Sequence, residues 1–350
     1  MTGTTDNSTA WPLASIIILN WNGLADTIKC LESFTGVSYP NYRIYLVDNG
    51  SRGNDADIIA EKFGPKITLI RNAQNKGFPG GNNQILNQLV IEKQPGYSLL
   101  INNDTEVYPD FLSELVKVLH SNDKIGAVTA KLFNSDGTIQ RSLRHFPTHF
   151  TTFASYCLPK FIFSAGLKRI LRQNKWLHRL IGKTAETYFW DFDSDEPQPI
   201  DNASGACLMV RNEILTSVGL LDENIFLSFE DVDWCYRLRH AGWEIYYVPT
   251  AKVVHHVGRS TKKGPEKLIY LFYQLESKSY FAQKHFSPRA RFVTASILIF
   301  ALLLRLPVVV YYTLFSFVYH SNFTESLASR YVKTWQKIFT HLFARRTKIC

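Results

Sequence analysis

The sequence is poor in sulfur-containing residues: its 350 residues include five Cys and two Met. The cysteines are widely scattered, and no two of them form a CxxC pair; they are Cys30, Cys157, Cys207, Cys235 and Cys350. This distribution excludes a disulfide framework and a cysteine-based zinc site, and it is typical of reduced thiols in the cytosol. The opening residues, MTGTTDNSTAWP, lack the basic-then-apolar layout of a signal peptide, so we do not expect export.

Two common nucleotide-binding signatures are also missing. No GxxxxGK[ST] occurs, and the turn after the first apolar run reads NWNG instead of GxGxxG. The sequence therefore argues against a P-loop NTPase and a dinucleotide dehydrogenase. Positive charge, in contrast, is in surplus, because 39 Lys and Arg face 30 Asp and Glu for a formal net charge of +9. Such a surplus favours a phosphate-rich partner, which is a nucleotide, a nucleic acid or an anionic membrane surface.

The first half of the chain alternates apolar runs with amphipathic segments. We expect strands at residues 15–19, 43–47, 67–70, 98–101 and 125–129. We expect helices at residues 25–34, 57–63, about 78–90 and 111–120. Strands that alternate with helices at this spacing predict an α/β fold with a mostly parallel central sheet and helices on both faces.

Polar residues follow the predicted strands where each one ends, namely Asn20, Asp48, Asn72 and Asp104. Ligands of such sheets bind at the carboxyl ends of the strands. Asp48 is well placed to accept hydrogen bonds from a ribose or base, although an Asx turn in DNGS is the alternative. The segment Asn102-Asn103-Asp104 offers oxygen ligands to a divalent ion, with a plain turn as the alternative.

The C-terminal third carries two apolar runs, at residues 292–304 and 306–318, split by Arg305 and Pro307. Together they exceed the roughly 20 residues that span a bilayer, but each alone is too short and a central arginine is costly in lipid. We expect a re-entrant or interfacial anchor; a kinked span and a buried helix pair are the alternatives. Basic residues flank the runs, as on a cytoplasmic face: Arg289, Arg291, Lys333, Lys337, Arg345, Arg346 and Lys348.

Residues 158–180 mix aromatic and aliphatic side chains with six Lys and Arg. This pattern indicates either a basic amphipathic helix at a membrane surface or an ordinary surface helix whose lysines reach into water. The basic residues lie away from the aromatic motifs, so we expect no nucleic-acid partner.

The segment FEDVDWCYR sets Glu230, Asp231 and Asp233 among aromatic and aliphatic residues. Carboxylates in such surroundings are costly to desolvate unless they are paired or used. The apolar spacing predicts a helix with Asp231 in its first turn. Asp231 is therefore a candidate general base, while the alternative is an N-terminal capping pattern that begins at Ser228.

Seven segments occur in the order seen in glycosyltransferase family 2: SIIILNWNG, YLVDNGS, RNAQNKGFPGGNN, LLINNDTEV, DNASGACLMVRNEIL, FLSFEDVDWCYRLRHAGW and VPTAKVVHHVGRS. They cover roughly residues 14–260 and most resemble the bacterial rhamnosyltransferase-like branch. The resemblance implies a GT-A fold, a nucleoside-diphosphate sugar donor, Mn²⁺ or Mg²⁺ on its diphosphate, and transfer with inversion.

The resemblance also implies roles for single residues. Asp231 matches the catalytic base, with Glu230 orienting the base or the acceptor. Asp104 and His255 match the metal ligands, and Asn102 stands where the family often has an aspartate, which leaves Asp104 as the main metal carboxylate. The implied donor-binding residues are Asn20, Asn22, Asp48, Asn72, Asn75, Gly77, Asn82, Asn102, Asn103 and Arg259. The expected acceptor-binding residues are Gly205 and Trp234, the latter as a platform on which a sugar stacks.

We therefore expect five segments: an N-terminal tail (1–13), a nucleotide-sugar-binding half (14–132), a basic and aromatic insertion that acts as a membrane or acceptor lid (133–200), an acceptor and catalytic half (201–285), and membrane-associated helices with a basic tail (286–350). The expected function is transfer of a sugar, first of all rhamnose, to a glycan or lipid-linked acceptor at the cytoplasmic face of the cell membrane. The alternatives are a nucleotidyltransferase with a related sheet and an inactive nucleotide-sugar-binding scaffold.

Overall fold

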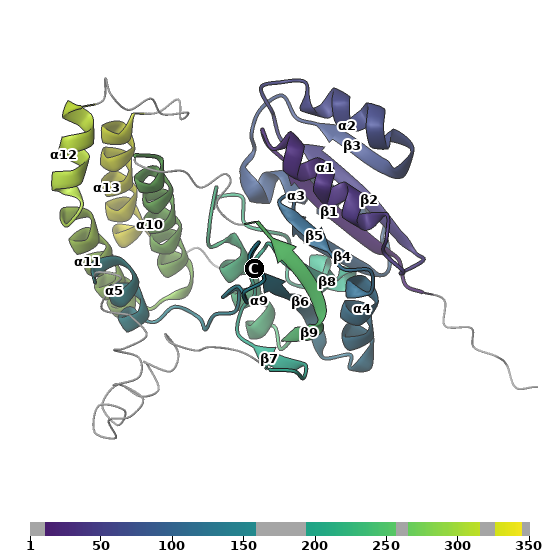
Figure 1. The fold of residues 1–350 in the computed structure, drawn as a ribbon. Helices are drawn as coiled ribbons and strands as arrows, with labels where there is room; N and C mark the ends of the chain where they lie inside the picture. Colours follow the sequence, from purple (N-terminus) through teal and green to yellow (C-terminus); the bar gives the residue numbers. More distant parts are fainter. Residues whose placement is uncertain (1–10, 159–193, 257–264, 316–325, 345–350) are drawn as a thin grey trace, which may run out of the picture.

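The computed structural model describes residues 11–158, 194–256, 265–315 and 326–344, which form a layered α/β body and a helical bundle beside it (Figure 1). The predicted helix at residues 158–180, Arg259 and the basic residues after Ala344 lie outside the described residues.

The body is built on a nine-stranded sheet in the order β3-β2-β1-β4-β8-β6-β9-β5, with β7 paired to β9. Its strands are β1 (Ala14–Asn20), β2 (Tyr42–Asp48), β3 (Ile67–Arg71), β4 (Tyr97–Asn102), β5 (Thr105–Val107), β6 (Ile125–Phe133), β7 (Gln198–Ile200), β8 (Cys207–Arg211) and β9 (Glu244–His255). Strands β1 to β4 are parallel, as are β6 and β9, whereas β5, β7 and β8 run antiparallel to their neighbours. The predicted α/β fold with a mostly parallel sheet is confirmed.

The two faces of the sheet bury separate cores, because successive residues of a strand point to opposite sides. Ile16 and Ile18 of β1 belong to one core and Ile17 to the other. The first face is covered by α1 (Leu24–Phe34), α2 (Asp55–Phe63) and α4 (Phe111–Ser121), and the second by α3 (Gly77–Ile91), α8 (Asn212–Ser217) and α9 (Glu230–His240). A 3₁₀ turn, Gly64–Lys66, leads into β3.

The bundle consists of α5 (His149–Cys157), α10 (Pro265–His285), α11 (Pro288–Leu303), α12 (Leu306–Leu314) and α13 (Leu327–Phe343). It has its own apolar core, which includes Phe272, Leu298 and Ile338. Glu276 of α10 is buried in the bundle and pairs with Arg330 and Lys337 of α13. Helix α5 comes from the segment before residue 159 and packs on α11, so the predicted insertion contributes directly to the bundle.

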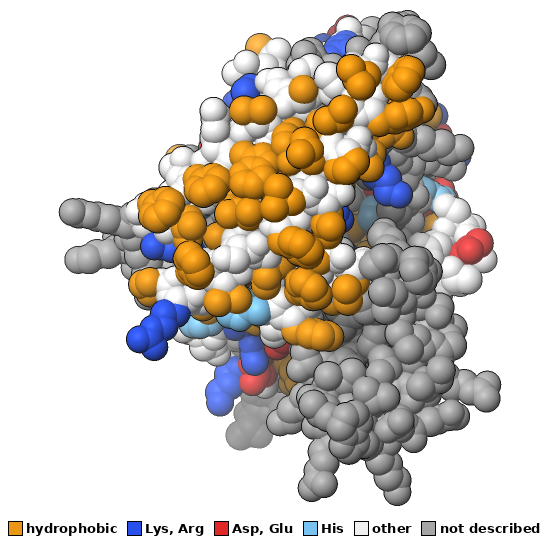
Figure 2. Space-filling view, turned by 90° about the vertical axis from the view of Figure 1, so that its left-hand side faces the viewer, with side chains coloured by type: hydrophobic (Ala, Val, Ile, Leu, Met, Phe, Trp, Pro, Cys, Tyr) orange, Lys and Arg blue, Asp and Glu red, His pale blue; other side chains and the backbone are white. Residues whose placement is uncertain are grey.

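The outer face of the bundle is apolar. Figure 2 shows hydrophobic side chains over most of the face that the bundle turns away from the sheet, with Lys and Arg at its margins. Its exposed members include Phe292, Phe300, Leu303, Leu304, Tyr311, Leu314, Val332, Phe339 and Phe343. Pro288–Leu314 forms one apolar stretch of 27 residues, and by length and composition this stretch is able to cross a membrane.

Candidate active site at the strand ends and the start of helix α9

The carboxyl ends of the parallel strands meet at one edge of the sheet, as the sequence predicts. The strand register places Asn20 beside Asp48, Leu19 beside Asn102, and Asp48 beside Arg71. Polar side chains from four strands are thereby gathered at the position where α/β proteins bind nucleotides.

Asn20 is the centre of a hydrogen-bond network in the middle of this edge. Its amide nitrogen donates to Asp48 Oδ1 at 2.8 Å and to Asp55 Oδ2 at 3.1 Å, and its Oδ1 accepts from the Thr27 hydroxyl at 2.8 Å. The Ser51 hydroxyl donates to Asp48 Oδ1 at 2.5 Å. Asn20 is 0% exposed, so it fixes the Asp48 carboxylate and does not line a ligand site itself, contrary to the expectation.

Asn49 ties the loop after β3 to the end of β2. Its Oδ1 accepts from Asn72 Nδ2 at 3.0 Å, and its Nδ2 donates to Asn75 Oδ1 at 3.1 Å and to the Gly77 carbonyl at 3.0 Å. Gly77 has φ of +74°, and a Cβ at this position would lie 2.7 Å from the Phe226 carbonyl oxygen. The turn that opens α3 therefore requires glycine.

The remaining residues predicted to bind the sugar donor differ in how accessible they are. Asn22 lies in the exposed turn after β1, where its Oδ1 accepts from the Arg52 N–H at 2.9 Å. Asn103 is partly buried and donates to the Thr27 hydroxyl at 2.8 Å. Asn82, by contrast, is buried inside α3 and donates to the Phe78 carbonyl one turn earlier, so its predicted contact with the donor is not supported.

The predicted metal ligands lie where β4 ends and β9 passes beside β5. His255 Nε2 is 3.1 Å from Asp104 Oδ1 and 3.3 Å from Asn102 Nδ2. His255 Nδ1 is 2.8 Å from Gln140 Oε1, a pure acceptor, so Nδ1 carries a proton and donates it. His256 points the other way and lies 2.7 Å from Glu106 Oε1, as expected for neighbouring residues of a strand.

These residues fit a divalent cation. In the neutral imidazole with Nδ1 protonated, the Nε2 lone pair faces the Asp104 carboxylate, an arrangement that calls for a proton or a cation between the two. One carboxylate, one imidazole nitrogen and the Asn102 amide suit Mn²⁺ or Mg²⁺ when substrate oxygens supply the other ligands. Among the described residues, no three His, Cys, Asp or Glu side chains form a metal-binding group, so a protein-only site of that kind is not present there.

Helix α9 begins beside this edge with a constrained turn. Ser228 and Phe229 both have left-handed backbone conformations, with φ of +63° and +73°. The Ser228 hydroxyl donates to the Tyr270 hydroxyl at 2.9 Å and does not cap the helix, so the alternative capping pattern is not formed. Asp231 Oδ2 instead accepts from the Gly205 N–H at 3.0 Å, and Oδ1 accepts from the Val232 N–H at 2.8 Å.

The first two acids of α9 are shifted toward their protonated forms. Burial, only partly offset by the Gly205 and Val232 N–H groups, raises the pKa of Asp231. Burial together with the neighbouring Asp231 charge raises the pKa of Glu230 to about 8. Glu230 Oε2 is buried without a hydrogen-bond partner among the described residues. The pair therefore carries less than two negative charges at neutral pH, and Asp231 accepts a proton more readily than an exposed aspartate does.

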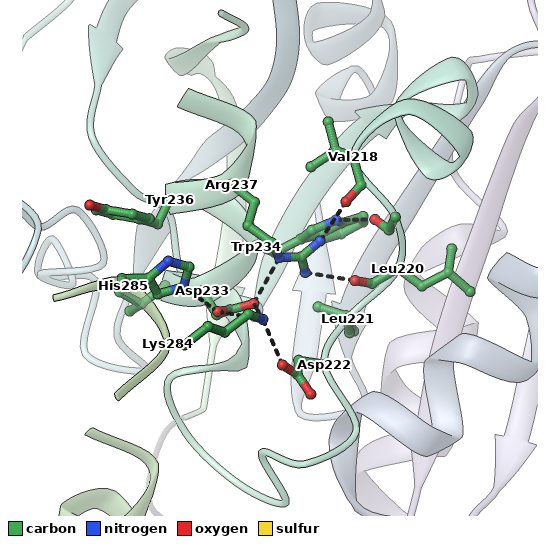
Figure 3. Close-up of polar contacts among 12 residues, drawn as sticks. Val218, Leu220, Leu221, Asp222, Asp233, Trp234, Tyr236, Arg237, Lys284 and His285 are labelled. Atoms are coloured by element: carbon green, nitrogen blue, oxygen red, sulfur yellow. Dashed lines mark hydrogen bonds and ion pairs between the residues drawn. The ribbon is translucent and has the colours of Figure 1, made fainter. Parts of the chain in front are cut away.

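The third acid of the helix has the opposite environment. Asp233 accepts from His285 Nε2 at 2.7 Å, Arg237 Nε at 2.9 Å and Lys284 Nζ at 3.0 Å (Figure 3). Burial alone would raise the pKa of Asp233, but the His285 hydrogen bond and the charges of Arg237 and Lys284 hold it well below its usual range. Asp233 thus joins α9 to α10 and has a structural role.

Trp234 does not take the role that the sequence predicts for it. Its side chain is 0% exposed, packs in the core beneath α9 and donates from Nε1 to the Gly219 carbonyl at 2.8 Å (Figure 3). A ring enclosed in this way cannot stack on a sugar. Gly205, the other predicted acceptor residue, is buried and contributes its N–H to Asp231; a Cβ there would lie 3.2 Å from Phe78.

Sequence reasoning missed several supporting residues. Asn49, which links Asn72, Asn75 and Gly77, and Gln140, which orients His255, are not among the predicted site residues. Asn49 directly follows Asp48, so its place at a strand end was a signal that could have identified it. Gln140 lies 115 residues from His255, so nothing local in the sequence connects the two.

The sheet, the strand-end polar edge and the acid-bearing helix together define a GT-A-type glycosyltransferase fold. Residues 12–269 match the profile described as "Glycosyltransferase like family 2", and the chain belongs to that family of enzymes. The fold is similar to a solved structure of GalNAc-T7 with UDP, GalNAc and Mn²⁺, with a TM-score of 0.51, 15% identity, and coverage of 79% of this chain and 51% of that one.

Three curated relatives illustrate the range of the family. The uncharacterized protein y4gI of Sinorhizobium fredii is 30% identical over 73% of this chain, and the match spans 26% of that protein. The N-acetylglucosaminyl-diphospho-decaprenol L-rhamnosyltransferase of Mycobacterium tuberculosis is 26% identical over 63% of this chain and 69% of its own. The low-salt glycan biosynthesis hexosyltransferase Agl10 of Haloferax volcanii is 24% identical, with 81% of both chains covered.

Proposed function

We propose that this enzyme transfers a sugar from a nucleoside-diphosphate sugar to a glycan or lipid-linked acceptor with inversion, in a single displacement. One observation carries the proposal. The Gly205 N–H bonds the Asp231 carboxylate, and the carbonyl of the next residue, Ala206, accepts from the Asn102 N–H at 3.1 Å. The consecutive residues Gly205 and Ala206 thus connect the candidate base, Asp231, to the end of β4 that carries the candidate metal ligands.

Asp231 supplies the base. In an inverting transfer the acceptor hydroxyl attacks the anomeric carbon opposite the leaving diphosphate, so it must lose its proton on the acceptor side. The raised pKa of Asp231 makes it a better proton acceptor near neutral pH than an exposed aspartate. Glu230 keeps its proton at pH 7, because burial and the Asp231 charge raise its pKa to about 8. Only one of the two adjacent carboxyls is then negative.

The other side of the site holds the leaving group. Asp104, His255 and Asn102 would hold Mn²⁺ or Mg²⁺, and such an ion neutralises a diphosphate. Gln140 fixes the His255 ring so that Nε2 faces Asp104. Asp48, held by Asn20 and Ser51, accepts hydrogen bonds from the donor's nucleoside. Asn22, Asn72, Asn75 and Asn103 lie along the same edge and are the proposed remaining donor contacts.

The relatives guide the choice of substrate. Because one of them is a rhamnosyltransferase whose acceptor is diphospho-decaprenol-linked, we propose rhamnose as the first donor sugar to test. Hexoses and galactofuranose are the next, since another relative is a hexosyltransferase. A nucleotidyltransferase would need no acid-bearing helix beside the acceptor, and an inactive scaffold would not be expected to keep Asp104, Asp231 and His255 together.

We propose that the enzyme lies at the cytoplasmic surface of the cell membrane, and the exposed apolar face of the bundle supports this location. Arg305 interrupts the stretch between α11 and α12 and donates to the Ala301 carbonyl at 2.9 Å. Helices α10 and α13 pack against one side of this stretch, while the other side is exposed (Figure 2). A one-sided apolar face that contains a charged interruption suits burial at the interface better than a full crossing.

The experiment is a transfer assay with the full-length protein on vesicles. Thymidine diphosphate-rhamnose and a panel of hexose donors are supplied with a prenyl-diphosphate-linked N-acetylglucosamine acceptor and Mn²⁺ or Mg²⁺. The proposal predicts transfer from one donor, loss of transfer in EDTA, and a product of inverted anomeric configuration by NMR. Retained configuration would refute the single displacement, and transfer of a nucleotidyl group would refute the sugar-transfer proposal.

A further inference from the structure

Lys278 of α10 is a buried cation without a carboxylate partner. The residue is 5% exposed, and its Nζ lies 5.1 Å from the ring centroid of Tyr156 and 5.2 Å from that of Phe229. Among the described residues, no acid forms an ion pair with it. Lys284, six residues along the same helix, is buried as well but lies 2.6 Å from Asp222 and 3.0 Å from Asp233.

The surroundings of Lys278 disfavour its charge. Burial, together with the nearby Arg144 guanidinium, lowers the pKa of Lys278 to about 7. Two aromatic faces stabilise an ammonium by cation–π attraction, but they do not neutralise it. Buried charges in proteins are normally paired. Lys278 has the exposed cation Arg144 near it and, in the described part of the chain, no carboxylate in an ion pair, so its charge suits an anion from outside the chain.

Lys278 lies between the proposed base and the apolar face. Phe229 directly precedes the first residue of α9 and is two residues from Asp231, whose charge is also within reach of Arg144. Tyr156 belongs to α5, which packs on α11; Phe153 of α5 stacks on Phe300 of α11, with ring centroids 6.5 Å apart. Both of these phenylalanines are exposed members of the apolar surface.

We propose that Lys278 and Arg144 bind the phosphate group of a lipid-phosphate-linked acceptor, with the acceptor sugar toward Asp231 and the hydrocarbon chain along the apolar face. An amphiphile of this kind satisfies both features, since its anion pairs the two cations and its tail covers the exposed side chains. The inference rests on the proposed function and narrows its acceptor to a lipid phosphate or diphosphate.

The test uses farnesyl diphosphate as the probe and the full-length protein in neutral detergent. Binding is measured by calorimetry in EDTA, so that the Asp104 and His255 side of the site does not capture the diphosphate through a metal. Farnesol and inorganic diphosphate are the matched ligands, and vesicles of phosphatidylglycerol or phosphatidylcholine form a separate arm. Lys278→Met and Arg144→Gln are the variants, with Lys284→Met as the control lysine of the same helix.

Wild-type protein should bind farnesyl diphosphate more tightly than either farnesol or inorganic diphosphate. Lys278→Met should weaken that affinity about tenfold or more, because hydrogen bonds to charged groups contribute about 1.5–3 kcal/mol each. The variant should melt no lower than the wild type, since it removes an unpaired buried charge. Lys284→Met should instead lower the melting temperature and leave the affinity of the folded protein unchanged.

Three results would overturn the inference: no binding of farnesyl diphosphate by the wild type, equal affinity in Lys278→Met, or an equal loss of binding to phosphatidylglycerol vesicles. The last would assign the two cations to membrane headgroups. Metal-dependent binding of a nucleoside diphosphate is measured on the same Lys278→Met protein and should be unchanged. The donor side of the proposed function therefore stands or fails separately from this inference.

Discussion

Two of the three acids of helix α9 lie two residues apart and meet different parts of the molecule. Asp231 accepts from the N–H of Gly205, just before β8, and from the N–H of its neighbour Val232. Asp233 accepts from Lys284 and His285 of the bundle helix α10 and from Arg237 one turn along α9. Burial favours the protonated form of both carboxyls, yet the pKa of Asp231 is raised and that of Asp233 is lowered.

The difference shows that hydrogen-bond and ion-pair partners, more than burial, determine whether a buried carboxyl is ionised and which role it has. Three cationic or proton-donating side chains keep Asp233 ionised and hold α9 against α10. Two neutral N–H groups orient Asp231 without neutralising it, so its carboxylate stays available to a proton. Surrounding hydrophobic residues alone could not have separated these roles, because both acids lie in the same short segment.

The largest effect is expected from Asp231→Asn. The amide keeps the size of the side chain but cannot accept the proton of an acceptor hydroxyl, so transfer should fall by about 10²–10⁴-fold. Donor nucleotide affinity should change little, because Asp231 lies on the acceptor side of the sugar. The melting temperature should not fall, because burial disfavours the charge that is removed. Initial transfer rates, calorimetry with nucleoside diphosphate and thermal unfolding, all on one preparation, check these three expectations.

Asp233→Asn should act on stability instead. Removing one partner of a buried ion cluster costs about 3–5 kcal/mol. Arg237, Lys284 and His285 all lose the negative charge that they share, although Lys284 keeps Asp222. Chemical denaturation should show a correspondingly smaller free energy of unfolding, while the folded fraction keeps its transfer rate. The free energies of unfolding of Lys284→Met, Asp233→Asn and the double variant form a double-mutant cycle. If the loss in the double variant equals the sum of the two single losses, Lys284 and Asp233 do not interact directly.

The third prediction concerns the pH dependence of stability through Glu230, whose effect within any one pH unit is smaller than the two effects above. Its pKa is raised to about 8 in the folded protein, against about 4.3 in an unfolded chain. Its contribution is therefore complete below about pH 4.3 and is lost as pH rises through about 8. Glu230→Gln stays neutral, so its free energy of unfolding should gain on the wild type across this window, by at most about 1.4 kcal/mol per pH unit.

Asp233 should change the stability with pH in the opposite direction to Glu230. Its folded pKa is lowered, so the stability that it contributes is present above about pH 3.9 and is lost only as pH falls through the folded value. Denaturation curves between pH 5 and 9 should consequently be insensitive to the titration of Asp233. A Glu230→Gln profile parallel to that of the wild type would contradict the proton assigned to Glu230.

Much of the fold follows from the sequence, because β-branched runs and amphipathic helices alternate clearly up to residue 133. The short strands β5 and β7 were not predicted, because they have three residues each, too few for a periodic pattern. Strand β9 continues through Pro249, with a register shift against β6 between Ala130 and Lys131.

The site was predictable where its residues lie at strand ends or within one helix, and not where distant segments meet. Trp234 was misjudged because it directly follows the acids of α9, whereas its side chain lies in the same core as those of Cys235 and Leu238. Two of the three partners of Asp233, Lys284 and His285, come from α10, more than fifty residues later. No local pattern distinguishes Lys278 from Lys284; only the packed helices show which of the two is paired.

The most direct test of the account compares Asp231→Asn with Asp233→Asn. The quantity to measure is the transfer rate per folded molecule, with the folded fraction of each variant taken from its own denaturation curve under the assay conditions. The account predicts that the Asp231→Asn rate is lower than the Asp233→Asn rate by at least about a hundredfold, the lower end expected for loss of a general base. Equal rates per folded molecule would contradict it, because Asp231 would then be no more than another buried acid of the helix.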